Sequence, residues 1–331
     1  MSGWPLYAAA GVFGLLVGSF LNVVILRLPA RLMHDWRCQC EELLAGDAKA
    51  VAPSEAIAAD AVSTEETPIA PMSLEALEHA AHQVDPSIVE VTPTSEPAAT
   101  APAPPDLVFV GSHCMHCKHP LSPLDNIPLV SWLALGGRCR YCKAPISIQY
   151  PLVEALAALA AVVVVWQFGF TWQAAAGLAL SFALIALAGI DFHTQLLPDN
   201  ITLPLLWGGL LLSLQPVFVD PVSAILGGAL GYLSLWSVYW LFKLATGKEG
   251  MGHGDFKLVA ALGAWMGPWS LLPIILISSM LGAVIGSIAL LARRQDRSTP
   301  IPFGPFIAAA GWVQFIWGPQ LAQWYQSVFV A

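Results

Sequence analysis

The feature that most constrains this chain is a series of apolar segments, each close to the length that crosses a lipid bilayer. A helix needs about 20 apolar residues to span the hydrocarbon core. About eight such windows occur, the sixth being short, near residues 5–26, 151–168, 172–190, 200–215, 221–242, 256–267, 269–292 and 303–326. Hydrophobic residues make up 56% of the chain and charged residues 11%, which is too apolar for an ordinary soluble fold. The sequence therefore predicts an all-α polytopic membrane protein with about eight transmembrane helices.

The basic residues predict an orientation in the membrane. Short loops that carry Lys and Arg stay on the cytoplasmic side. With eight spans and the N-terminus outside, all 14 Lys and Arg residues fall on that side. The predicted outer turns near Trp166 and Trp265 hold none of them. We therefore expect a multi-pass protein with its N-terminus outside and the lipid bilayer as the partner of its helices.

The stretch between the first and second apolar windows is not membrane-like. We divide the chain into a first transmembrane helix at 1–28, a cytoplasmic domain at 29–150 and a membrane-embedded domain at 151–331. Within the cytoplasmic domain, residues 41–106 contain 13 acidic residues and one base, Lys49, with many Ala, Pro, Ser and Thr. Such a composition buries too little surface to offset the entropy of ordering, so we expect an acidic disordered insert.

Two glycine pairs have the spacing that lets helices approach closely, Gly227 with Gly231 and Gly282 with Gly286. Chance explains either pair equally well in a chain with 27 glycines. The spacing alone leaves both explanations open.

Four cysteines predict a metal site in the cytoplasmic domain. Cys114 and Cys117 form one CxxC pair, and Cys139 and Cys142 form another. Two such pairs can place four thiolates around one tetrahedral ion, and a cytoplasmic location disfavours disulfides. A shell of four sulfurs leaves no open position on the metal. We therefore predict a structural zinc in a module at residues 111–145.

Acidic residues in the membrane domain are candidates for function, because a carboxylate near the bilayer is costly unless it is solvated or paired. From residue 151 onward the acids are Glu154, Asp191, Asp199, Asp220, Glu249, Asp255 and Asp296. Asp220 and Asp296 lie in predicted loops, where solvation explains them. Glu154 and Glu249 lie near the predicted inner interface, where water or a basic partner explains them.

Asp255 stands at the start of the sixth window, after "GMGHG". Gly252 and Gly254 give the backbone freedom to approach another part of the chain or to adopt positive φ. A plain N-cap role would also fit Asp255 at this place. The local sequence does not decide between a cap and a catalytic role.

A second acid at the same predicted depth favours catalysis. The third window ends at Asp191 and the fourth begins just after Asp199, so either could meet Asp255. Two close carboxylates share a proton, and one then activates water while the other polarises a carbonyl. This is aspartic protease chemistry without a metal. Asp199 precedes a helix and resembles an N-cap, whereas Asp191 has no comparable local role.

Several motifs together resemble the bacterial type IV prepilin peptidases. They are "GSFLNVVILRLP" at 18–29, the twin CxxC pairs, "DNIPLVSWLALGGRCRYCKAPISIQYPLVE", "IDFHTQLLPDNITLP", "GMGHGDFKLVAALGAW" and "IPFGPFIAAAG". The similarity covers nearly the whole chain except residues 41–106. These enzymes are GxGD-type aspartic peptidases of the bacterial inner membrane.

The resemblance implies that the chain removes the basic leader peptide from type IV prepilins and from type II secretion pseudopilins, cutting after a glycine at the cytoplasmic face. It also implies N-methylation of the new N-terminus with S-adenosylmethionine. Carried over by motif, Asp191 and Asp255 are the catalytic pair, and Gly252 and Gly254 support the catalytic loop. We expect structural zinc and S-adenosylmethionine as cofactors, prepilins, pseudopilins and the bilayer as partners, and no nucleic acid.

Two features depart from the family pattern. Many members carry a second acid two residues after the first catalytic aspartate, where this chain has His193. The long acidic insert replaces a compact loop. Two other functions compete with the peptidase: a proton-coupled transporter, which would need acids buried in mid-span, and a non-catalytic assembly factor held by its zinc module.

Overall fold

The computed structural model describes residues 3–51, 104–107, 111–122, 125, 127–248, 250–293 and 302–329. The chain divides into two units, one formed by Met1–Leu32 with Pro105–Ala331 and the other by Met33–Pro104. Apart from isolated β-bridges, the described residues form helices and turns and no β-strand. The prediction of an all-helical protein is confirmed.

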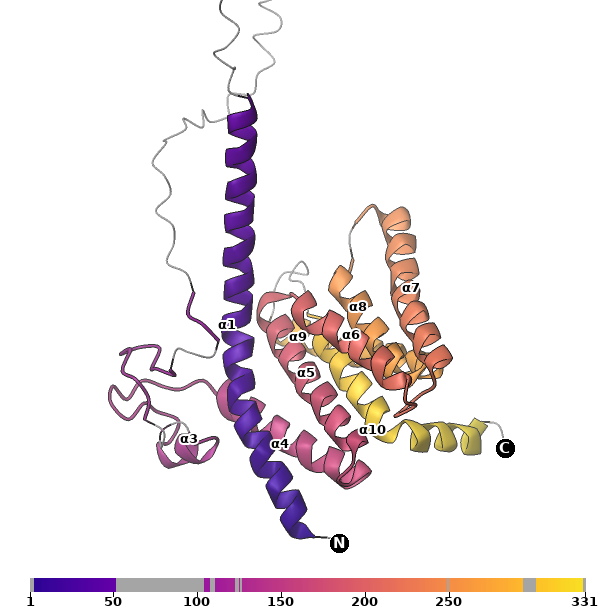
Figure 1. Ribbon diagram of the computed structural model, residues 1–331, viewed down its shortest axis with the longest axis horizontal. Helices are drawn as coiled ribbons and strands as arrows, with labels where there is room; N and C mark the ends of the chain where they lie inside the picture. The colour runs from indigo at the N-terminus through magenta and orange to yellow at the C-terminus, as the bar shows by residue number, and fades with distance from the viewer. Residues whose placement is uncertain are drawn as a thin grey trace, which may run out of the picture. The chain divides into compact units, whose positions relative to one another are not determined.

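The helices follow the predicted apolar windows closely (Figure 1). In chain order they are α1 (Trp4–Val51), α3 (Val130–Ala134), α4 (Gln149–Phe168), α5 (Trp172–Thr194), α6 (Asp199–Ser213), α7 (Pro221–Thr246), α8 (His253–Met266), the 3-10 turn η1 (Pro268–Ser270), α9 (Leu271–Arg293) and α10 (Gly304–Phe329). Each predicted window therefore contains one main helix.

Five segments of the described chain are long and apolar enough to cross a membrane: α1, α4, α5, α7 and the stretch from η1 through α9. They identify an integral membrane protein, but the predicted count of eight spans is not confirmed. α6 has 15 residues and α8 has 14. At 1.5 Å per residue these two helices rise only about 21–23 Å, less than the roughly 30 Å of a typical hydrocarbon core.

The first helix runs further than the first apolar window. α1 continues past Pro29 to Val51, and its second half is rich in Leu, Ala, Glu and Arg, which favour helix. Residues 41–51, which their composition predicts to be disordered, are therefore helical. Residues 52–103 of the predicted insert lie outside the described residues.

α8 is the central helix of the larger core. Ten of its 14 residues are buried. The helix packs chiefly against α7 and α6, and its buried apolar side chains belong to the same core cluster as those of α5 and α10. Phe256, Leu258 and Leu262 are fully buried. The indole N–H of Trp265 also donates a hydrogen bond of 2.7 Å to the Leu205 carbonyl of α6. A helix covered on all sides needs no polar face, which explains why α8 is apolar from Leu258 to its end.

The contact between α7 and α8 depends on small residues. A Cβ on Gly227 would lie 2.1 Å from the carbonyl oxygen of Gly263, and one on Gly231 would lie 2.7 Å from that of Val259. The first predicted glycine pair therefore serves close packing between two helices of the same chain. At Gly282, by contrast, a Cβ would first meet phenylalanine side chains at 3.3–3.4 Å, with no backbone atom as near.

The cysteine module, residues 111–145, contains two copies of one turn. Lys118 donates its N–H to the Cys114 carbonyl at 2.9 Å, and Lys143 donates to Cys139 at 3.1 Å. Both lysines have positive φ, 57° and 59°. The copies "CMHCKHP" and "CRYCKAP" are offset by 25 residues. Each CxxC pair is thus presented by the same backbone geometry.

Glu154 of α4 joins this module to the membrane helices. It is only 7% exposed, and its Oε2 accepts a 2.8 Å hydrogen bond from the N–H of Leu129, just before α3. Leu129 has a φ of 56°, a conformation that a leucine rarely adopts. The carboxylate therefore bonds to a strained backbone turn, whereas its sequence position predicted solvation or a basic partner.

Candidate functional site

A pocket of about 600 Å³ opens where α5 ends and α8 begins. Its walls are the last turn of α5, the α5–α6 loop, the first turns of α6 and α8 with the loop before α8, and the residues just before α10. Polar and apolar groups both line it. A pocket of this size can admit a stretch of extended peptide together with water.

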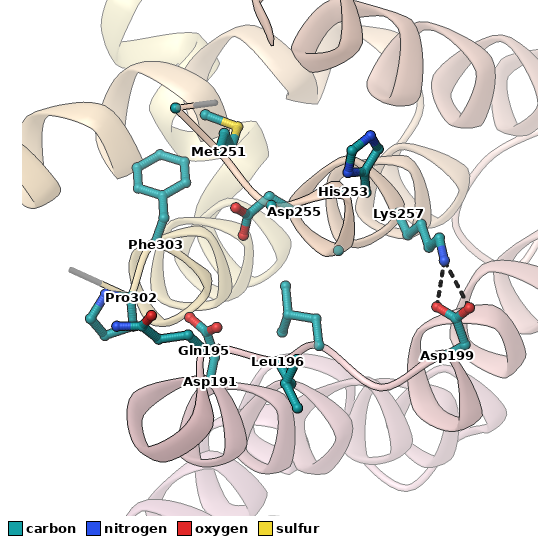
Figure 2. Close-up of a pocket in the computed structure, with 14 residues that line it drawn as sticks. Asp191, Gln195, Leu196, Asp199, Met251, His253, Asp255, Lys257, Pro302 and Phe303 are labelled. Atoms are coloured by element: carbon teal, nitrogen blue, oxygen red, sulfur yellow. Dashed lines mark hydrogen bonds and ion pairs between the residues drawn. The ribbon is translucent and has the colours of Figure 1, made fainter. Parts of the chain in front are cut away.

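Two carboxylates face each other across this pocket (Figure 2). Asp191 comes from the last turn of α5 and is 5% exposed, while Asp255 comes from the first turn of α8 and is 7% exposed. The fold thus brings together two acids that lie 64 residues apart in the sequence. Because both are withdrawn from bulk solvent, each strongly affects whether the other can carry a charge.

The surroundings of the two acids differ. The Oδ2 atom of Asp191 accepts a buried hydrogen bond of 2.9 Å from the backbone N–H of Gly304. Within the described residues, no hydrogen bond is assigned to the Asp255 carboxylate. The N-cap of α8 is Gly252, so Asp255 lies inside the first turn and is not the cap. The capping alternative for Asp255 is therefore wrong.

Asp199 has a different role from the one its sequence position predicted. Pro198 occupies the N-cap of α6, and Asp199 lies in the first turn of the helix. Its two carboxylate oxygens accept hydrogen bonds from the Nζ of Lys257 at 2.6 and 2.7 Å (Figure 2). The N-cap interpretation of Asp199 is wrong, and its carboxylate instead forms an ion pair with α8.

The two glycines before Asp255 act in different ways. A Cβ on Gly254 would lie 2.8 Å from the Cβ of Leu197, so Gly254 lets the start of α8 approach the α5–α6 loop. Gly252 has φ −78° and ψ 144°, which any residue can adopt. The expected close approach is thus present at Gly254, and neither glycine has positive φ.

Two histidines near the aspartates make contacts that sequence reasoning did not predict. The ring of His253 lies 5.2 Å from that of Tyr239 on α7 and 5.4 Å from that of Phe256, and His253 lines the pocket. The Nε2 of His193 lies 2.9 Å from the Oε1 of Gln149 on α4. Aromatic and amide partners of this kind leave no local pattern in the sequence.

The remaining acids of the membrane domain lie away from this pocket or outside the described chain. Asp220 is the N-cap of α7 and accepts hydrogen bonds from the N–H groups of Val222 and Ser223. Glu249 and Asp296 lie outside the described residues.

The four predicted cysteine ligands form a cluster. The sulfur atoms of Cys114, Cys117, Cys139 and Cys142 all lie within 4.8 Å of one another, and those of Cys114 and Cys142 are 3.7 Å apart. A tetrahedral zinc with Zn–S bonds of about 2.3 Å separates its sulfurs by about 3.8 Å. The four thiols therefore fit a tetrahedral metal ion.

Local hydrogen bonds favour the metal-binding form of one ligand. Backbone N–H groups of Cys117 and His116 lower the pKa of Cys114 to about 6. A thiolate, and not a thiol, binds a metal. The backbone of the first turn thus prepares its cysteine for metal binding.

Both parts of the chain match known protein families. Residues 12–168 match the bacterial peptidase A24 N-terminal domain, and residues 178–287 match the type IV leader peptidase family. No solved structure matches the chain.

Curated relatives are similar over nearly the full length. A protein of Xanthomonas campestris pv. campestris is 48% identical over 98% of this chain and 94% of its own length. A protein of Stutzerimonas stutzeri is 45% identical over 95% of this chain and 91% of its own length. A protein of Pseudomonas aeruginosa is 44% identical over the same shares of the two chains. All three are named prepilin leader peptidase/N-methyltransferase. The chain therefore belongs to the type IV leader peptidase family.

Proposed function

We propose that this protein is a membrane-bound aspartic endopeptidase that removes the leader peptide from type IV prepilins and related pseudopilins. The observation that carries the proposal is the pair of buried carboxylates, Asp191 and Asp255, facing each other in one pocket. Family membership and the names of the relatives supply the substrate class.

The proposed reaction uses one proton held by the pair. A water molecule between the carboxylates gives a proton to the ionised member, and its oxygen attacks the carbonyl carbon of the scissile peptide bond. The protonated member donates its proton to the carbonyl oxygen. As the resulting diol collapses, the C–N bond breaks, the protonated carboxyl donates its proton to the leaving amine, and one diol hydroxyl gives its proton to the ionised carboxylate. The pair then again holds one proton.

The position of the acids favours a peptidase over a proton-coupled transporter. A transporter of that kind uses acids buried in the middle of its spans. Here Asp191 lies in the last turn of one helix and Asp255 in the first turn of another, on the wall of an open pocket. A peptide segment outside the bilayer could enter such a site, which suits cleavage of a leader.

We place the protein in the bacterial inner membrane, with its N-terminus outside and the catalytic and zinc sites on the cytoplasmic side. The distribution of Lys and Arg supports this orientation. In this arrangement 1–28 forms the first transmembrane segment, 29–150 the cytoplasmic domain with its insert and zinc module, and 151–331 the peptidase domain.

We further propose that the cysteine cluster binds zinc as a structural ion. With four sulfur ligands the ion would hold the two CxxC turns together and take no part in peptide cleavage. The relatives' names also support N-methylation of the new N-terminus, with S-adenosylmethionine as methyl donor. The described residues form no strand followed by a glycine-rich loop, so we assign no residue to that donor.

The test compares Asp191→Asn and Asp255→Asn with the wild type in a bilayer, using a prepilin as substrate. Each variant should lose cleavage by about 10²–10⁴-fold or more while remaining folded, because Asn keeps the shape but cannot carry the proton. Mass spectrometry of the product separates cleavage from the added mass of one methyl group. Asp220→Asn is the matched control and should cleave normally, since Asn is an equally good helix cap. Full activity in either Asp191→Asn or Asp255→Asn would refute the proposed mechanism.

A further inference from the structure

The motif "IPFGPFIAAAG" contributes a part of the pocket that the catalytic pair does not explain. Pro302 and Phe303 line the pocket (Figure 2). Gly304 follows them and begins α10. The buried N–H of Gly304 donates the 2.9 Å hydrogen bond to Asp191. An element 113 residues away in the sequence therefore touches one of the two proposed catalytic groups.

The N–H of Gly304 is available because of where the helix starts. The first amides of a helix have no partner within it. Pro305 has no N–H at all, and the N–H groups of Phe306 and Ile307 already bond to the Phe303 carbonyl. Among the residues of this first turn, Gly304 is thus the one that can donate to a neighbouring side chain.

Glycine at position 304 also leaves space for the Asp191 carboxylate, because it has no side chain. A Cβ placed there would lie 2.7 Å from Oδ2, 3.0 Å from Cγ and 3.2 Å from Cβ of Asp191. All three nearest atoms belong to the same aspartate. Because these are side-chain atoms and not backbone atoms, an added Cβ would displace the carboxylate of Asp191. Alanine at this position should therefore disturb the catalytic geometry more than the fold.

The hydrogen bond also gives the two carboxylate oxygens of Asp191 different environments. An amide N–H can only donate, so Oδ2 must act as its acceptor. The bond stabilises negative charge on Oδ2, so it favours a proton on Oδ1 and leaves Oδ1 with both lone pairs for water. The bond thus favours one edge of the carboxylate for the reaction.

We propose that Gly304 is a positioning residue for the cleavage reaction. Its N–H holds Oδ2 of Asp191, and its lack of a side chain leaves the space in which that carboxylate lies. The start of α10 is then a third element of the active site, beside the end of α5 and the start of α8. This inference rests on the proposed peptidase function.

The test measures cleavage by Gly304→Ala, with Gly318→Ala as a control in the same helix. A Cβ on Gly318 first meets the end of the Gln314 side chain, away from the pocket. We expect kcat of Gly304→Ala to fall on the order of 100-fold, the cost of a displacement of about 1 Å, with little change in KM. The pH profile of kcat should also change in this variant, whereas the Gly318→Ala profile should match that of the wild type.

A merely structural role for Gly304 would give a different result. Thermal unfolding of both glycine variants should stay close to that of the wild type, and a kcat per folded Gly304→Ala molecule equal to that of the wild type would overturn the inference. Should Gly304→Ala fail to fold, an ester in place of the peptide bond between 303 and 304 removes the N–H without adding a side chain. It should lower kcat in the same direction, and an ester variant with unchanged kcat would also overturn it.

The two proposals fail in distinguishable ways. If Asp191→Asn and Asp255→Asn are inactive but Gly304→Ala has normal kcat and a normal pH profile, only the positioning role is refuted. If the two Asn variants cleave like the wild type, the proposed function itself is refuted.

Discussion

Lys257 illustrates how a single residue outside any recognised catalytic role contributes to the pocket. Its Nζ bonds to both oxygens of Asp199, and the pair joins the second turn of α8 to the first turn of α6. The two side chains are 31% and 50% exposed. Solvent therefore screens the attraction, and such pairs contribute about 0.2–1 kcal/mol. The pair links the helix that carries Asp255 to α6.

Asp199→Asn and Lys257→Met should both retain cleavage, with rates reduced by only a few-fold. The physical reason is that either change breaks a partly exposed ion pair and leaves Asp191 and Asp255 in place. Thermal unfolding should show a loss of up to about 1 kcal/mol in each single variant. The double variant should lose less than the sum of the two, because both changes remove the same interaction. An inactive Asp199→Asn beside an active Asp191→Asn would instead make Asp199 the catalytic partner.

Sequence reasoning found the two acids that face each other but not their neighbours. Asp191 and Asp255 stand out because a carboxylate at the end of an apolar helix needs an explanation. The partners of Asp191 and Asp199, which are Gly304 and Lys257, lie 113 and 58 residues away. Only the tertiary fold brings such groups together. The misassignment of Asp199 arose because the sequence did not show that Pro198 takes the cap position.

At the scale of elements, the apolar windows predicted where the helices lie, because burial and lipid contact both demand apolar side chains. They did not show which helices cross the bilayer, since a buried helix and a lipid-facing helix look alike by composition. The same rule failed for the second half of α1, where helix-forming polar residues continue the helix to Val51. The repeated turn of the cysteine module was visible in the sequence as "CMHCKHP" and "CRYCKAP". The cysteine spacing alone does not reveal that the two turns repeat.

Replacing Cys139 with Ser should lower both the zinc content and the stability of the protein. Cys139 is the buried member of the cluster, 3% exposed, and a shell of three sulfurs and a water holds zinc less well. Zinc per protein by elemental analysis and thermal unfolding are the measurements. Cys40→Ser is the control, since Cys40 is exposed and is not one of the clustered cysteines. Full zinc occupancy with unchanged stability in Cys139→Ser would argue against a four-sulfur site.

At the scale of the whole molecule, the chain that contains the acidic insert leaves and re-enters the larger unit at nearly one place. Asp106 contacts both Arg27 and Arg31 of α1: its carbonyl oxygen accepts from Arg27 at 2.7 Å, and its carboxylate pairs with Arg31 at 2.5 Å. The points of exit and return are therefore already close together. A short linker can replace most of the sequence between them.

Replacing residues 41–103 with a Gly/Ser linker of about eight residues should leave prepilin cleavage within about twofold of the full-length rate. Such a linker is flexible, so it imposes no fixed geometry on the return of the chain to Asp106. A matched variant carries the same linker together with Asp106→Asn, which tests whether the contact with α1 matters once the insert is gone. If the first deletion inserts and folds but cannot cleave, the insert takes part in catalysis or substrate binding.

The shortness of α6 and α8 has a consequence for the lipid around them. Their neighbours α5 and α7 have 23 and 26 residues and rise about 35–39 Å, whereas α6 and α8 rise only about 21–23 Å. Because α8 is covered by its neighbours, α6 is the short helix that meets lipid, through exposed side chains such as Trp207 and Leu211. Lipid next to α6 must thin to avoid a hydrophobic mismatch, and the thinning lets water reach further down on the side where α6 and α8 begin. Asp255 lies at that end of α8. We therefore expect the thickness of the host bilayer to change how much water reaches the proposed catalytic pair, so that acyl-chain length becomes a variable of the reaction.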